Sequence, residues 1–141
     1  GGLNHRLGLD DAAMLKENHI AWAGVISKAL KAIKASVPWP SKIIVEAETI
    51  NEVEEAIQAG ADGILLDDIP PEVLLSHVPK WRDLASKRSS SIGSNQIVLE
   101  ASGINPKSIK IYAATGIDLI STSAPMTKSN WVDISMRFTT T

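Results

Sequence analysis

Two stretches of the chain share one pattern, and this internal repeat restricts the possible folds more than any other feature. In the first stretch, a short β-branched run at 42–48 is followed by apolar residues at helical spacing and by a second apolar run at 63–66. In the second stretch, runs at 96–100 and 118–121 flank another helical segment. Strands that alternate with helices through short connections form parallel sheets with right-handed crossovers. The repeat therefore predicts an α/β protein.

The helices inside both repeats carry start and stop signals. Thr49 is followed three residues later by Glu52, which makes a capping box, and Gly60 stands where a left-handed residue ends a helix. Asn105 and Pro106 supply an N-cap and a first-turn proline in the second repeat. The residues expected to bury the second helix are Ile109, Tyr112 and Ala113.

The same periodicities assign the rest of the chain. A strand and a turn are expected over 10–20, a helix over 21–35, and a proline-started helix over 70–85. Residues 87–95 are polar and indicate a surface loop. Apolar and polar residues alternate over 132–138, which is typical of a half-buried strand.

The number of strands leaves two architectures open. A (β/α) barrel needs about eight strands, or about six when it is open, and this chain offers only about five. The chain is then either an incomplete barrel or a smaller open α/β sheet, and the repeat alone does not decide between them. The first residue is Gly1 rather than methionine, as in a cut or processed segment. This start is compatible with an incomplete barrel.

Composition and charge exclude some classes of protein. The chain is 44% apolar and 21% charged, which is ordinary for a globular domain, and a net charge of −2 gives no reason to expect nucleic acid or an acidic membrane as a partner. No apolar run approaches the roughly 18–20 residues of a membrane span, and no signal-like start is present. The chain has no cysteine, which excludes disulfides and thiolate zinc sites and fits a cytoplasmic protein.

Polar residues follow the predicted strands at the end where parallel α/β proteins place their sites. Singly, each of them is also explained as a helix cap or a turn residue, and only their convergence suggests a function. Carboxylates hold Mg²⁺ or ribose hydroxyls, cations hold carboxylates or phosphates, and serine-rich turns hold a phosphate. The mixture therefore suits a sugar phosphate with a divalent metal. The acidic members are Glu46, Glu48, Asp67, Asp68 and Glu100.

Five motifs occur in order over essentially the whole chain. They are His5-Arg6-Leu7-Gly8-Leu9-Asp10 with Leu15-Lys16-Glu17-Asn18-His19-Ile20, Ile44-Val45-Glu46-Ala47-Glu48, Ala59-Gly60-Ala61-Asp62 with Leu65-Leu66-Asp67-Asp68, Leu99-Glu100-Ala101-Ser102-Gly103-Ile104-Asn105, and Gly116-Ile117-Asp118-Leu119-Ile120-Ser121. Together they resemble the signatures of the quinolinate phosphoribosyltransferase family. The resemblance implies that residues 1–141 are the C-terminal part of an α/β-barrel catalytic domain of the phosphoribosyltransferase type. The barrel is incomplete here, because the family's N-terminal sandwich domain and first barrel strands have no counterpart.

The resemblance also implies an activity. Members of the family transfer a phosphoribosyl group from phosphoribosyl pyrophosphate to quinolinate with Mg²⁺, giving nicotinate mononucleotide, pyrophosphate and CO₂ for NAD biosynthesis. They act as homodimers or higher homo-oligomers, and part of each site comes from a neighbouring subunit. This chain alone is therefore expected to show little or no transferase activity.

The resemblance assigns roles to individual residues. Those implied to hold the substrate carboxylates are His5, Arg6 and Lys16, with His19 in support. Those implied to bind the ribose hydroxyls and the metal are Glu46 and Asp67, which with Lys16 form the catalytic set. Those implied to cradle the 5′-phosphate are Ser102, Gly103, Ser123 and Ala124.

The sequence departs from the family pattern in its phosphate loops, and two other interpretations stay open. The turn Ser102-Gly103-Ile104 is one residue shorter than the family's Ser-Gly-Gly-Ile, which would move an amide donor for the phosphate. Lys128 stands where the family often has histidine. One alternative is the related family associated with molybdenum transport. The other is a truncated, non-catalytic barrel segment that binds phosphate or partners weakly.

Overall fold

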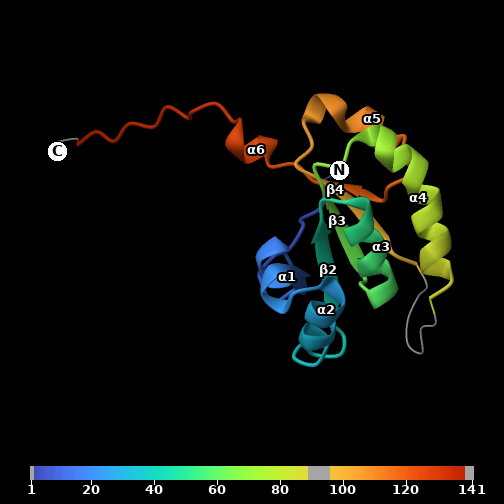
Figure 1. The fold of residues 1–141 in the computed structure, drawn as a ribbon. Helices are drawn as coiled ribbons and strands as arrows, with labels where there is room; N and C mark the ends of the chain where they lie inside the picture. The colour runs from blue at the N-terminus through green and yellow to red at the C-terminus, as the bar shows by residue number, and fades with distance from the viewer. Residues whose placement is uncertain (1, 89–95, 139–141) are drawn as a thin grey trace.

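The computed structural model describes residues 2–88 and 96–138, and they form one parallel sheet with helices beside it (Figure 1). The five strands follow one another across the sheet in chain order, and every neighbouring pair is parallel. They are β1 (Ala12–Leu15), β2 (Lys42–Ala47), β3 (Gly63–Asp67), β4 (Val98–Ser102) and β5 (Leu119–Ile120). The predicted parallel α/β fold is confirmed.

The connections between strands are helical. The helices are α1 (Glu17–Ala23), α2 (Ile26–Lys34), α3 (Ile50–Ala59), α4 (Pro71–Ser86), the 3₁₀ turn η1 (Pro106–Ser108), α5 (Ile109–Ala113) and α6 (Ala124–Thr127). Within residues 2–88 and 96–138, no helix is both long enough and apolar enough to cross a membrane.

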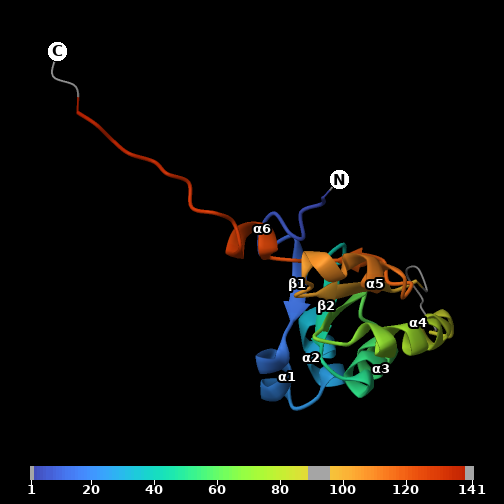
Figure 2. The ribbon, with the colours of Figure 1, turned by 90° about the horizontal axis from the view of Figure 1, so that it is seen from above.

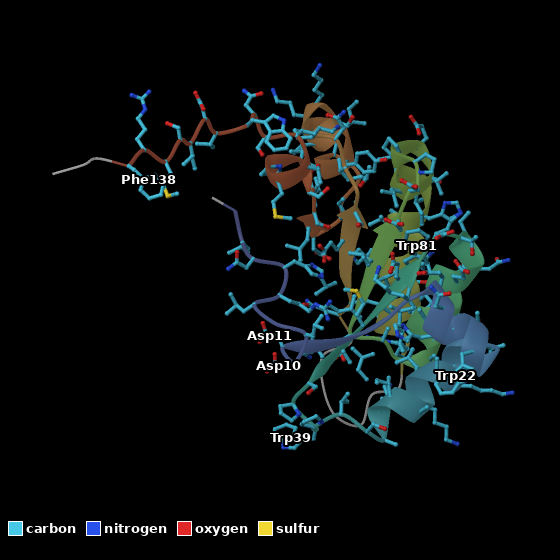
Figure 3. The ribbon with its side chains drawn as sticks, turned by 90° about the vertical axis from the view of Figure 1, so that its left-hand side faces the viewer. Asp10, Asp11, Trp22, Trp39, Trp81 and Phe138 are labelled. Carbon is cyan, nitrogen blue, oxygen red and sulfur yellow. The ribbon has the colours of Figure 1, made fainter. Side chains whose placement is uncertain are left out.

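One face of the sheet and the inner sides of α2, α3 and α4 form the hydrophobic core (Figure 2). Side chains alternate between the two faces of a strand, so every second residue of β2, such as Val45, enters this core. Ile64 and Leu66 do the same from β3, and both are fully buried. Trp81 of α4 closes the core and is also fully buried, whereas Trp22 and Trp39 lie on the outside (Figure 3).

The opposite face carries no helix of the core, and we call it the open face. Its residues lie between the core-facing ones along each strand, and they include Ile44, Leu65 and Val98. Val98 keeps 44% of its surface exposed and Leu119 keeps 42%. Towards the carboxyl ends of the strands, this face changes from apolar to charged residues.

The predicted helix signals are confirmed. The amide of Glu52 donates to the Thr49 hydroxyl at 3.3 Å, and the Glu52 carboxylate accepts from the Thr49 amide at 3.0 Å. Gly60 ends α3 with a φ of 86°, which is the left-handed conformation. Asn105 accepts from the amide of Lys107 at 3.0 Å and starts η1.

The repeat has a structural cause at the amino ends of the strands. The carboxylate of Asp62 accepts from the Ile43 amide at 2.9 Å, and that of Asp118 accepts from the Leu99 amide at 2.8 Å. Each aspartate therefore fastens the entry of its own strand to the start of the preceding strand. Arg82 of α4 also reaches the Asp118 carboxylate, at 2.7 Å.

Replacing Asp118 with alanine is expected to lower the free energy of unfolding by about 1–2 kcal/mol, because it leaves the Leu99 amide without its acceptor and removes the ion pair with Arg82. Urea denaturation monitored by circular dichroism measures this loss. The matched control is Asp83→Ala, which removes only a surface ion pair with Lys87 and should cost under about 0.5 kcal/mol. Equal losses for the two variants would contradict the role given to Asp118.

Three predictions about the elements are wrong. The helix expected over 21–35 is two helices, because Gly24 ends α1 with a φ of 90° and donates its amide to Ile20 at 2.8 Å. The strand expected over 132–138 does not form. No strand of the described residues lies beside this segment, so its apolar side chains stay exposed, and Phe138 lies far from the sheet (Figure 3).

The third correction concerns the second helix of the repeat. Of its expected buried residues only Tyr112 is half-buried, while Ile109 is 38% exposed and Ala113 is exposed. The reason is that α5 packs beside β5, the last and shortest strand of the sheet, where little surface is available to cover it. The polar loop expected over 87–95 lies mostly outside the described residues.

Candidate functional site

The candidate site lies on the open face, near the carboxyl ends of β2, β3 and β4. In the strand register, Glu46 is opposite Leu65 and Leu65 is opposite Glu100, so these three residues form one row across the sheet. Neighbouring strands are about 4.8 Å apart, which separates the two glutamates by about 10 Å. Asp67 lies two residues beyond Leu65 on the same face, in register with Ser102. Three carboxylates therefore surround one patch of the open face.

Lys16 directly follows β1 and pairs with the first of these carboxylates. Its Nζ lies 2.7 Å from Oε2 of Glu46, whose side chain is only 11% exposed. The hydrogen bond that Lys16 donates to the Glu46 carboxylate is the main cause that raises the pKa of Lys16 above its ordinary value of 10.5, and partial burial opposes it. The charges of Glu46, Glu17 and Asp67 raise the pKa further. Lys16 is thus a cation beside two of the predicted catalytic carboxylates.

The raised pKa of Lys16 predicts how the pair responds to pH. Stabilisation from a raised pKa is fully present below the ordinary value and is lost as pH rises through the folded-state value. Lys16→Met should therefore change the free energy of unfolding by one small amount, under about 1 kcal/mol, at both pH 6 and pH 9. The gap between variant and parent should close only above about pH 10.5. Denaturation curves in which this gap changes between pH 6 and pH 9 would contradict the assignment.

His5 pairs with the carboxylate at the other end of the row. Its Nδ1 lies 3.1 Å from Oε1 of Glu100, although the two residues are 95 positions apart in sequence. Glu100 is 8% exposed, and among the residues that the structure describes, only Glu100 and Thr115 are polar or charged and buried. The chain's first residues thus fold back over β4.

Arg6 and His19 have backbone partners. Arg6 donates from Nη1 to the carbonyl of Ala12 at 3.2 Å, at the start of β1. His19 accepts at Nδ1 from the amide of Lys16 at 3.0 Å and so fixes the first turn of α1. The structure therefore places His19 as a support for Lys16. It pairs the Arg6 guanidinium with the main chain and not with the row of carboxylates.

The two loops predicted to cradle a phosphate lie side by side. The amide of Ile104 donates to the carbonyl of Ser121 at 3.2 Å, which joins the loop after β4 to the loop after β5. Gly103 has a φ of 72°, and a β-carbon built on it would lie 4.0 Å from Oδ1 of Asp67. The tight turn at Gly103 therefore brings the first loop next to Asp67.

A hollow lies next to these loops, between η1 and α6. It is lined by Asn105, Pro106, Lys107, Ala124, Pro125 and Lys128. Of the four residues predicted for the phosphate, Ala124 lines this hollow, Gly103 lies beside Asp67, Ser102 ends β4, and Ser123 precedes α6. The two lysines make the hollow basic.

The sequence patterns do not predict the partner of His5. They mark Glu100 only as a strand-end acid, and they give Lys107 no role. The signal for Glu100 was present, because it is a charge inside the apolar run Ile97 to Ala101. A charged side chain is almost never fully buried without a partner, so a second group had to face it.

The described residues offer two carboxylates that could bind Mg²⁺, those of Glu46 and Asp67. Among residues 2–88 and 96–138, no group of three or more histidine, cysteine, aspartate or glutamate side chains converges on one point. Mg²⁺ usually keeps several waters and binds through one or two carboxylates plus substrate phosphates. The carboxylates of Glu46 and Asp67 satisfy that pattern, and Lys16 already neutralises part of their charge.

A parallel sheet with carboxylates, cations and glycine-serine turns at its strand ends defines an α/β protein of the barrel-enzyme class. The family described as quinolinate phosphoribosyl transferase, C-terminal domain, matches residues 1–137. The chain therefore belongs to the quinolinate phosphoribosyltransferase family and corresponds to its C-terminal domain.

Curated relatives are similar to this chain over nearly its whole length. A probable nicotinate-nucleotide pyrophosphorylase (carboxylating) from Synechocystis is 40% identical over 97% of this chain and 44% of its own length. One from Methanothermobacter thermautotrophicus is 36% identical over 96% of this chain and 47% of its own length. The chain thus spans about half the length of the curated relatives it matches.

Solved structures agree. The nicotinate-nucleotide pyrophosphorylase from Francisella tularensis superposes with a TM-score of 0.74 at 37% identity, over 88% of this chain and 40% of that protein. NadC from Streptococcus pyogenes superposes with a TM-score of 0.70 at 32% identity, over 98% of this chain and 45% of that protein. The α/β fold class and the assignment to part of a larger barrel are confirmed.

Proposed function

We propose that the protein containing this chain transfers a phosphoribosyl group from phosphoribosyl pyrophosphate to quinolinate, with decarboxylation to nicotinate mononucleotide. One observation carries the proposal. The Lys16–Glu46 ion pair stands beside Asp67 on the open face, with a spacing of 2.7 Å between Nζ and Oε2, and all three residues occupy family motifs. The relatives' names agree with this reaction and do not favour the molybdenum-transport alternative.

Charge explains how such a site would bind its two substrates. Quinolinate carries two adjacent carboxylates, so it needs cations, and Lys16 and His5 lie at the two ends of the row of carboxylates. Charge-assisted bonds of this kind are about twice as strong as neutral ones. Arg6 would join them only if its side chain left the carbonyl of Ala12.

The same carboxylates would then assist the transfer. The bond from the ribose C1 to pyrophosphate breaks, the pyridine nitrogen bonds to C1, and the oxocarbenium-like ribose between these events gains stability from Glu46 and Asp67. The positively charged pyridinium ring next accepts the electron pair that the adjacent carboxylate leaves behind as CO₂, and a proton from solvent takes its place. Bound Mg²⁺ would neutralise the leaving pyrophosphate. The residues mainly orient and neutralise the reactants.

The 5′-phosphate would lie between the loops after β4 and β5. Ser102 and Gly103 contribute from one loop, and Ser123 and Ala124 from the other, across the hydrogen bond between Ile104 and Ser121. Lys107 and Lys128 would add positive charge from the neighbouring hollow. This charge would offset the amide donor that the shortened turn removes.

The remaining parts of the proposal follow from the family resemblance. They are a requirement for Mg²⁺, a homodimer or higher homo-oligomer, and a cytoplasmic location. Each substrate is a small molecule, so neither nucleic acid nor a membrane enters the reaction.

Calorimetry tests the proposed function. The longest natural protein that contains this chain is expected to bind phosphoribosyl pyrophosphate about tenfold more tightly with Mg²⁺ than without it, as a shared phosphate–carboxylate metal site requires. It should also release CO₂ from carboxyl-labelled quinolinate when both substrates are present. Binding without release of CO₂ would point to the non-catalytic alternative. Absence of any binding would refute the proposal.

A further inference from the structure

Glu100 occupies an unusual position and takes no part in the proposed reaction. It is the acidic residue that β4 buries, in the row that also holds Glu46, and its side chain pairs with His5. Burial of a carboxylate is costly, so an unused one would be expected to be replaced by an apolar residue in the interior of a strand. Its retention on the open face calls for a function there.

The hydrogen bond determines what His5 can do. Nδ1 of His5 faces Oε1 of Glu100 at 3.1 Å, and a carboxylate can only accept, so Nδ1 is the donor. In the imidazolium form of the ring, Nε2 is a second N–H donor, and this is the form that can bind a carboxylate. The ring is then fixed in orientation, and its other nitrogen, Nε2, is free to face a ligand. His5 belongs to an exposed segment, in which Leu3 and Asn4 are also exposed, so the rest of the chain does little to fix its ring. Without Glu100 its ring would have no fixed direction.

We propose that Glu100 is a positioning residue that holds His5 so that Nε2 faces the carboxylates of quinolinate. This inference rests on the proposed function. It predicts an effect on quinolinate and not on phosphoribosyl pyrophosphate, because the latter is assigned to Glu46, Asp67 and the loops after β4 and β5. A carboxylate that served only the fold would affect both substrates alike.

Two substitutions separate orientation from charge. Glu100→Gln keeps an oxygen that accepts from Nδ1, whereas Glu100→Ala removes the acceptor. Glu100→Ala should weaken quinolinate binding by roughly ten- to a hundredfold, the range expected for a lost hydrogen bond to a charged group. Glu100→Gln should restore most of that loss, to within about threefold of the parent. Neither variant should change KM for phosphoribosyl pyrophosphate by more than about twofold.

A double-mutant cycle with His5→Ala tests whether Glu100 acts through His5. If it does, adding His5→Ala to Glu100→Ala causes little further loss of quinolinate affinity, because the two changes remove one unit. The matched control is Glu54→Gln, a change of the same kind in the middle of α3, away from the open face. It should leave both KM values unchanged.

The experiment measures quinolinate affinity by calorimetry, both KM values, and the protonated ring nitrogen of His5 by nitrogen-15 NMR, in the longest natural protein that contains this chain. Protonation at Nδ1 in the parent, and its loss in Glu100→Ala, is the expected NMR result, and it does not depend on any enzymatic activity.

A parent that shows this pairing but binds no quinolinate would refute the proposed function and not the pairing. A parent that binds quinolinate, with a Glu100→Ala variant of unchanged affinity or equal loss for both substrates, would overturn the positioning role. If Glu100→Ala does not fold, the data for Glu100→Gln and His5→Ala decide the matter, since unchanged quinolinate affinity in His5→Ala, or an Nδ1 that carries no proton in the parent, contradicts the proposal.

Discussion

Glu46→Ala is expected to lower kcat for nicotinate mononucleotide formation by roughly 10²- to 10³-fold in the longest natural protein that contains this chain. That range is typical for the loss of one preorganised group that stabilises charge in a transition state. Glu46 is suited to the role because its carboxylate is 11% exposed and already carries a cation at 2.7 Å. In such surroundings its interaction with a developing positive charge is screened less by water than it would be at a surface.

The pKa of Lys16 in the Glu46→Ala variant shows whether the loss of rate comes from catalysis or from unfolding. Removal of Glu46 leaves Lys16 without its main partner, so the pKa of Lys16 should return towards its ordinary value while the fold persists. Lys16→Ala should reduce kcat/KM by a similar factor through loss of substrate binding. Glu54→Ala, in the middle of α3, is the control and should leave the rate within about twofold of the parent. Near-normal kinetics for Glu46→Ala would refute its assigned role.

The sequence was sufficient for those parts of the fold that local rules determine. The capping box at Thr49 and Glu52 and the left-handed Gly60 are fixed by contacts within a few residues, and both were predicted. The parallel direction of the strands followed from their alternation with helices, because a helix between two strands returns the chain to the same end of the sheet. Gly24 obeys the same local rule, because a glycine with a positive φ ends α1 inside the segment 21–35.

Predictions failed where an element depends on a distant partner. The alternation over 132–138 is real, but a strand exists only when another strand pairs with it. Ile109 likewise has helical spacing without a surface that would bury it. In both cases the periodicity reports which side chains could share a face and says nothing about what covers that face.

In the candidate site, too, the residues marked by local patterns could be predicted, and the contact between distant residues could not. Strand-end position marked Glu46 and Asp67, since the carboxyl ends of parallel strands meet at one edge. The pairing of His5 with Glu100 joins residues 95 positions apart, and no local pattern encodes it. Glu100 could have been suspected as a charge within an apolar strand, but its partner required the three-dimensional structure.

The 141 residues alone are expected to convert quinolinate at least 10³-fold more slowly than the Synechocystis relative, a protein of which this chain matches 44%. The physical reason is the open face. Val98 and Leu119 keep 44% and 42% of their surface exposed on it, so reactants bound over this face would remain in contact with water, although Glu46 and Glu100 themselves are largely buried. Alignment of the reactants and their electrostatic stabilisation away from water supply most of a rate enhancement of this size, and both would be incomplete on an uncovered face.

The assay for this prediction follows pyridine nucleotide formation at saturating concentrations of both substrates and Mg²⁺, with the Synechocystis relative as the positive control. Circular dichroism of the same sample should show a folded α/β chain, because the core around Ile64 and Trp81 is complete on the helical side of the sheet. A folded chain without turnover is then the expected result, and it would assign the loss to the uncovered face and not to unfolding. Turnover within about tenfold of the relative would show that the open face suffices for catalysis, and the dependence on a closed barrel would have to be abandoned.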